Sequence, residues 1–175
     1  MHIRMFSGAV RRMWAVMAAM LLFAAGMLVY SPKAHAQSFG PFALRNGNGL
    51  CMDVRDYSTS NGAVLQVYDC TYASNQNFIF YDTPAFAVYT ITASNSGKCL
   101  DIRDASTANG AQLQQWTCNG QSNQLFYIYP ITATSGSLQP LHVGGKCLTA
   151  SGNYNTALVV QSTCNGSAAQ EWEFL

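Results

Sequence analysis

The spacing of six cysteines constrains this chain more than any other feature, because it indicates that one unit was copied three times. The first cysteine of each copy lies 48 residues from the next, and the second cysteines are 48 and 46 residues apart. The two series are Cys51, Cys99, Cys147 and Cys70, Cys118, Cys164. Residues 51–78 and 99–126 share 16 identical positions in 28. Three units of about 45 residues are each too small to bury an apolar side alone, so we expect them to close on one core.

Each copy contains four short apolar stretches, and residues 37–175 show no convincing apolar period of 3.6 residues. The dipeptides Asn61-Gly62 and Asn109-Gly110 are typical of tight turns between strands. We therefore predict an all-β fold of twelve short strands. The expected strands are 42–44, 51–54, 64–68 and 78–80 in the first copy, 89–92, 99–102, 112–116 and 125–128 in the second, and 141–143, 147–149, 158–161 and 172–175 in the third.

The first 36 residues have the order of a secretory signal peptide. A basic start precedes an apolar run at 13–30, and a small-x-small sequence follows at 34–36. Cleavage after Ala36 would leave 37–175 as the mature chain, secreted to the periplasm or the extracellular space. The alternative is an uncleaved membrane anchor, since a run of this length can just span a bilayer.

The cysteine count and the charge balance agree with export. An even number of cysteines in an exported chain indicates disulfides, and the simplest pairing lies within each copy, although other pairings remain open. Residues 37–175 contain five Lys and Arg against eight Asp and Glu, a net charge of −3. Because nucleic-acid binding calls for a basic face, this balance argues against nucleic acid as a partner.

Several motifs recur together and resemble the ricin B-chain type lectin family. They are Cys-Leu-Asp-Ile at 99–102, Asn-Gly at 109–110, Gln-x-Trp-x-Cys at 114–118 and Asn-Gln-x-Phe at 123–126, with close counterparts in the first copy. Members of this family also serve as carbohydrate-binding modules in bacterial glycoside hydrolases. The resemblance covers roughly 40–175 and implies a β-trefoil domain at 37–175, with repeats at about 40–84, 85–133 and 134–175.

The resemblance also implies one shallow sugar site in each complete repeat. The implied residues are Asp53, Gln66, Tyr68, Asn75 and Gln76 in the first repeat and Asp101, Gln114, Trp116, Asn123 and Gln124 in the second. The third repeat departs from the pattern. It has Thr149, Val160, Ser162 and Ala169 at four of these positions and keeps Gln170. We therefore predict two sites.

These residue types suit a sugar on chemical grounds. A carboxylate accepts hydrogen bonds from adjacent hydroxyls, an amide both donates and accepts, and an aromatic ring covers the C–H face of a hexose. The third repeat acts as an internal control, since positions kept in all three copies should serve the fold. Gln76 and Gln124, which are retained as Gln170, are by this argument weaker site residues that bridge backbone groups.

Each of these residues also has a possible structural role. Asp53 and Asp101 could anchor turns, and Tyr68 and Trp116 could be core aromatics, although Ser162 would then leave a hole. Asp56, Asp104 and His142 are interpreted as turn, surface or structural residues. The sequence contains no nucleophile elbow and no metal-ligand spacing, so we expect no catalysis, metal or cofactor.

Three functions remain. The first is a secreted lectin for galactose-type or xylan-type glycans. The second is a β-trefoil protease inhibitor, which would not call for a duplicated Asp, Gln and aromatic set. The third is the targeting subunit of a toxin or hydrolase with a separate effector chain. In each case we expect no membrane insertion of the mature chain.

Overall fold

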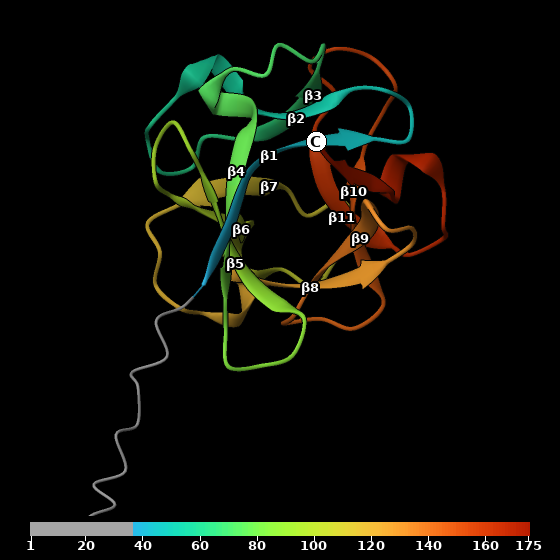
Figure 1. The fold of residues 1–175 in the computed structure, drawn as a ribbon. Coiled ribbons are helices and arrows are strands. Elements are labelled where there is room, and N and C mark those ends of the chain that lie inside the picture. Colours follow the sequence, from blue (N-terminus) through green and yellow to red (C-terminus); the bar gives the residue numbers. More distant parts are fainter. Residues whose placement is uncertain (1–36) are drawn as a thin grey trace, which may run out of the picture. The chain divides into compact units, whose positions relative to one another are not determined.

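The computed structural model describes residues 37–175, which contain twelve β-strands and five single turns of 3-10 helix (Figure 1). The predicted leader lies outside the described residues. The strands are β1 (Ser38–Asn46), β2 (Cys51–Val54), β3 (Leu65–Tyr68), β4 (Asn77–Asp82), β5 (Val88–Ala93), β6 (Cys99–Ile102), β7 (Leu113–Trp116), β8 (Leu125–Pro130), β9 (Ser135–Pro140), β10 (Lys146–Ala150), β11 (Val159–Thr163) and β12 (Trp172–Phe174). The helical turns are η1 (Arg55–Tyr57), η2 (Ser74–Gln76), η3 (Arg103–Ala105), η4 (Ser122–Gln124) and η5 (Ala168–Gln170).

Six strands close into a barrel. Antiparallel pairing runs from β1 to β4, β5, β8, β9 and β12, and β12 returns to β1. Each repeat contributes two barrel strands, its first and its last. Because β1 and β12 pair with each other, with Leu44 opposite Phe174, all three repeats are needed to close the ring.

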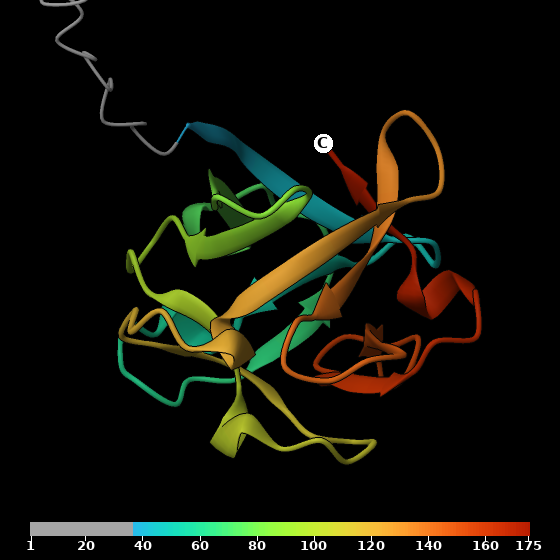
Figure 2. The same ribbon diagram turned by 90° about the horizontal axis from the view of Figure 1, so that it is seen from below.

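The remaining six strands form three hairpins, one per repeat. They are β2–β3, β6–β7 and β10–β11, and isolated bridges join each hairpin to the other two. In Figure 2 the last repeat, orange to red, lies on a different side of the molecule from the green and yellow segments of the first two. The six-stranded barrel with three hairpins confirms the predicted β-trefoil.

One apolar core is shared by all three repeats. It takes side chains from the barrel and from the inner faces of the hairpins, including the equivalent residues Leu65, Leu113 and Val159, all fully buried. At a second equivalent position the core holds Phe78, Phe126 and Trp172. Burying an aliphatic or aromatic side chain of this size stabilises a fold by about 1.5–3 kcal/mol, so this common core binds the repeats together.

Each repeat contains one disulfide. The bonds are Cys51–Cys70, Cys99–Cys118 and Cys147–Cys164, with Cα atoms 5.1 Å apart in each. Each closes the loop that carries its own hairpin. The predicted pairing within each repeat is thus confirmed.

The third repeat contains one error of strand prediction. The apolar pattern predicts a strand at 141–143, but β9 ends at Pro140 and the next residues form a turn. The barrel strand lies instead in the polar sequence SGSLQP, where Gly136 fits against β8 because a Cβ there would come within 2.9 Å of the Tyr129 carbonyl oxygen. Hydrophobicity alone could not reveal a strand fixed by such a close backbone approach.

Residues 37–175 contain no helix long and apolar enough to cross a membrane. In the same range no group of three or more His, Cys, Asp or Glu side chains is arranged to hold a metal ion. His142 Nε2 lies 2.9 Å from the Ser106 carbonyl oxygen and links the third repeat to the second.

Candidate functional site

Two of the three hairpins carry the same polar arrangement on the face turned away from the core. In the second repeat Asp101 of β6 lies directly opposite Gln114 of β7, and Trp116 lies two residues further along β7. Because side chains alternate along a strand, all three belong to one face while Leu113 points into the core. In the first repeat the cross-strand pair is Asp53 and Gln66.

The two aspartates are buried and are held by amide groups. Asp101 accepts hydrogen bonds at Oδ1 from Gln114 Nε2 (2.8 Å) and at Oδ2 from Asn123 Nδ2 and Gln124 Nε2 (both 2.9 Å). These bonds fix the carboxylate with neutral donors, so its negative charge is not cancelled by a contacting cation.

The first repeat reproduces this network. Asp53 accepts from Gln66 Nε2 at 2.9 Å, from Asn75 Nδ2 at 2.7 Å and from Gln76 Nε2 at 3.0 Å. Burial raises the pKa of Asp53 above its ordinary value, the three amide hydrogen bonds act in the opposite direction, and the nearby Asp56 carboxylate adds a smaller rise.

An arginine extends each network to another repeat. Arg103 Nε donates to Gln114 Oε1 (2.9 Å) and its Nη2 donates to the Gly62 carbonyl oxygen of the first repeat (3.3 Å). Arg55 Nε donates in the same way to Gln66 Oε1 (2.6 Å) and its Nη2 to the Thr156 carbonyl oxygen of the third repeat (3.1 Å). The glutamines are thus held at both ends of their amide groups.

Each network forms the floor of an open hollow. We call the hollow of the first repeat site one and that of the second site two, with volumes of about 520 Å³ and 470 Å³. Site one is lined by Asp53, Arg55, Asp56, Tyr57, Gln66, Tyr68, Asn75 and Thr156, and site two by Gly62, Asp101, Arg103, Asp104, Ala105, Gln114, Trp116, Asn119 and Asn123.

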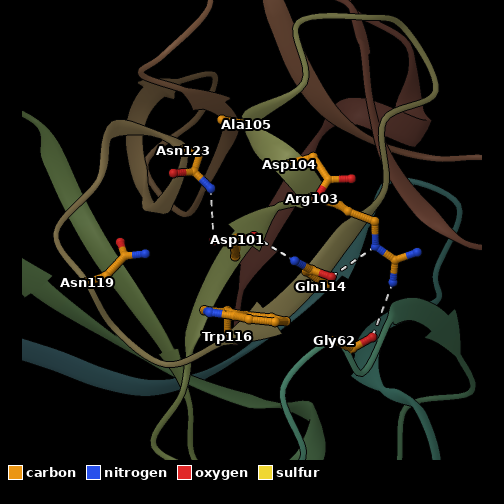
Figure 3. Close-up of a pocket in the computed structure, with 9 residues that line it drawn as sticks. All are labelled: Gly62, Asp101, Arg103, Asp104, Ala105, Gln114, Trp116, Asn119 and Asn123. Carbon is orange, nitrogen blue, oxygen red and sulfur yellow. Dashed lines mark hydrogen bonds between the residues drawn. The ribbon is translucent and has the colours of Figure 1, made fainter.

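The aromatic residues are walls of these hollows and not core side chains. Tyr68 is 37% exposed and Trp116 is 41% exposed. Figure 3 shows Asp101 at the centre of site two, with Trp116 and Gly62 on one side and Asp104 and Ala105 on the other. An exposed flat ring beside a fixed carboxylate can cover an apolar face of a ligand while the carboxylate accepts from its hydroxyls.

Part of the rim of each site has an unusual backbone. Asp56 and Tyr57 have φ of 57° and 53°, and Asp104 and Ala105 have φ of 57° and 48°. Two successive non-glycine residues in the left-handed region are strained, and such strain is concentrated at functional sites. Asp56 and Asp104 are exposed turn residues, as predicted, but they also line the hollows.

The third repeat has the hairpin without this arrangement. Where the others have the buried carboxylate, Thr149 Oγ1 accepts from Gln170 Nε2 at 3.0 Å and donates to the Cys147 carbonyl oxygen at 2.9 Å. Gln170 also bridges the backbone of Asn165 and Thr163.

Gln76 and Gln124 make the same backbone bridges as Gln170. Gln124 Oε1 accepts from the Asn119 amide at 2.9 Å, and its Nε2 donates to the Thr117 carbonyl oxygen at 3.1 Å. Gln76 bridges Thr71 and Asp69 in this way. These contacts match the interpretation of the two glutamines as residues that bridge backbone groups. The structure adds that each also donates a hydrogen bond to the buried aspartate of its own repeat.

Residues 87–175 match the family described as the ricin-type β-trefoil lectin domain. The chain belongs to this family.

Solved structures agree with the fold of this ricin-type lectin domain. The designed three-fold symmetric protein ThreeFoil is 28% identical with a TM-score of 0.72, and the match covers 77% of this chain and 96% of that one. An exo-β-1,3-galactanase from Clostridium thermocellum is 24% identical with a TM-score of 0.71, over 83% of this chain but 31% of that one. The Rhizoctonia solani agglutinin is 17% identical with a TM-score of 0.69, over 80% and 94%.

Sequence reasoning missed the residues of this lectin domain that join one repeat to another at the sites. Arg55 and Arg103 recur in the two complete repeats and have no counterpart in the third, so the same internal control could have found them. Gly62 and Thr156 carried no such signal, because each lines the site of a different repeat from its own.

Proposed function

We propose that residues 37–175 bind glycans at site one and site two and catalyse no reaction. The observation that carries this proposal is the duplicated set of a buried carboxylate, amides and an exposed aromatic ring, lost jointly from the third repeat. If the fold itself required this set, all three hairpins would contain it.

The arrangement suits sugar hydroxyls. Each carboxylate accepts three amide hydrogen bonds, and its two oxygens can accept about four in all. One position thus remains for a hydroxyl, and Asp104 at the rim supplies a second acceptor. Trp116 offers its ring to the C–H face of the same sugar.

The ligands we propose are galactose-type or xylan-type glycans, the classes that the family resemblance implies. We further propose that the protein acts after export, because disulfides persist in oxidising compartments and each repeat carries one.

A glycan array with ring-truncation variants tests the proposal. The purified protein should bind, Tyr68→Ala and Trp116→Ala should each remove one site, and the double variant should bind nothing. The matched control is Phe86→Ala, which removes a ring that is 93% exposed outside both sites, and it should bind like the parent. A folded parent that binds no glycan would sink the proposal.

A further inference from the structure

In each repeat, the turn that precedes the second hairpin strand is hydrogen-bonded to another repeat. Together the three contacts link the repeats in a closed cycle. The first repeat's turn reaches the second, where Asn61 Oδ1 accepts from the Thr117 amide at 3.0 Å. The second reaches the third, where Asn109 Oδ1 accepts from the Thr163 amide at 2.9 Å. The third returns to the first, where Asn155 Oδ1 accepts from the Asp69 amide at 2.9 Å.

The residue after each of these asparagines also forms a backbone hydrogen bond to the other repeat. Gly62, Gly110 and Thr156 donate their backbone N–H to the carbonyl oxygens of Gln115, Gln161 and Val67 at 2.9, 2.8 and 2.9 Å. At site one and site two the carbonyl of this residue also accepts from the arginine of the site. One part of the wall of each site therefore comes from a different repeat, and at site one this part is Thr156 of the third repeat.

This wall position differs between the two sites. Gly62 and Gly110 have φ of +82° and +83°, a region that glycine enters freely, but the equivalent Thr156 has φ of +74°. A β-branched residue rarely adopts this conformation, so the threonine is held there against its own preference. It is exposed and lines site one.

The position lies beside the aromatic ring. A Cβ built on Gly62 would lie 3.8 Å from Trp116 Cζ3 and 3.9 Å from Gln114 Oε1. A side chain here therefore stands at the edge of a sugar stacked on the ring. In site two this space is open.

We infer that Thr156, from the repeat that has lost its own site, contacts the sugar in site one and sets a ligand preference different from that of site two. This inference rests on the proposed function. The hydroxyl of Thr156 hydrogen-bonds a hydroxyl at the edge of the sugar stacked on Tyr68. Site two accepts a sugar that is substituted or branched at that edge, because Gly62 leaves room for it.

The test uses chains with one working site. In a Trp116→Ala chain, which retains site one, Thr156→Gly should weaken binding of an unbranched oligosaccharide about 3- to 10-fold, the value of one hydrogen bond. The same change should admit branched ligands. Thr156→Val, which keeps the branched shape, should lose the affinity without admitting branched ligands, and Thr156→Ser should keep it. In a Tyr68→Ala chain, Gly62→Thr should exclude branched ligands from site two.

Gly110→Thr is the matched control. It imposes the same unfavourable φ, but it faces the third repeat, and a Cβ there would meet no atom of residues 37–175 within 4 Å. It should lower the melting temperature as Gly62→Thr does and leave the glycan profile unchanged.

The outcomes separate the two claims. A Trp116→Ala chain that binds glycans with the same profile before and after Thr156→Gly would overturn the inference and leave the proposed function standing. A folded Trp116→Ala chain that binds no glycan would overturn site one and the inference together.

Discussion

The second and third repeats have the same hairpin, the same disulfide and the same backbone-bridging glutamine, but they differ in what lies on the outer face. The second holds a buried carboxylate between amides beside an exposed tryptophan, and the third holds Thr149 and Ser162. The polar set is therefore not needed to build the hairpin. What the third repeat keeps is a guide to stability, and what it lacks is a guide to binding.

The largest effect should come from the disulfides. Replacing Cys99 and Cys118 by Ser, or Cys147 and Cys164 by Ser, opens loops of 19 and 17 residues and should lower the free energy of unfolding by about 3 kcal/mol in either repeat. Urea denaturation measures both. A much smaller loss in the third repeat would mean that its hairpin is no longer equivalent to the second.

The next effect should come from the bridging glutamines. Gln124→Leu and Gln170→Leu each leave a backbone N–H and a carbonyl without their partner, and each should cost about 1–3 kcal/mol of stability. Gln121→Leu, an exposed change, is the control and should alter stability little. Thermal unfolding checks all three. If only Gln124→Leu destabilised the fold, the glutamine would not have a common structural role.

A smaller effect, measured in binding, should follow removal of an arginine that has no counterpart in the third repeat. Arg103→Met removes the side chain that donates to both Gln114 Oε1 and the Gly62 carbonyl oxygen. It should weaken glycan binding at site two about 3- to 10-fold, a loss equivalent to about one hydrogen bond. Isothermal titration of a Tyr68→Ala chain measures it. Arg45→Met, which removes the arginine paired with Glu173 outside both sites, should bind like its parent. Unchanged affinity in Arg103→Met would show that the arginine does not contribute to glycan binding.

The smallest effect is a shift in the pH at which glycan binding is lost. Burial raises the pKa of Asp53. On acidification, the glycan affinity of a Trp116→Ala chain should therefore begin to fall while the pH is still above about 3.9, the ordinary pKa of aspartate. The fold binds this proton more tightly than the unfolded chain, so the Asp53 contribution to stability decreases as the pH rises from about 3.9 through the raised pKa. A binding midpoint at or below the ordinary value would contradict this prediction.

Much of this structure could be predicted because the three repeats of the sequence can be compared with one another. The cysteine spacing predicted three repeats and their disulfides, and the positions kept throughout, such as Leu65 and Leu113, are core residues. What could not be predicted depends on contacts between repeats. The Arg103 contact to Gly62 and the placement of Thr156 in site one appear only when the ring closes, and β9 is fixed by close backbone packing at Gly136.

The three hairpins also set the directions in which the sites face. Site one and site two lie on two of the three hairpins, which are joined to one another in a three-fold arrangement, so they open to different sides of the molecule. Such a molecule should bind at both sites when glycan chains surround it, as in a branched polymer. On a flat surface with sparse glycans, simultaneous binding at both sites should be less favourable. Its gain from having two sites would therefore depend on the geometry of the glycan as much as on its chemistry.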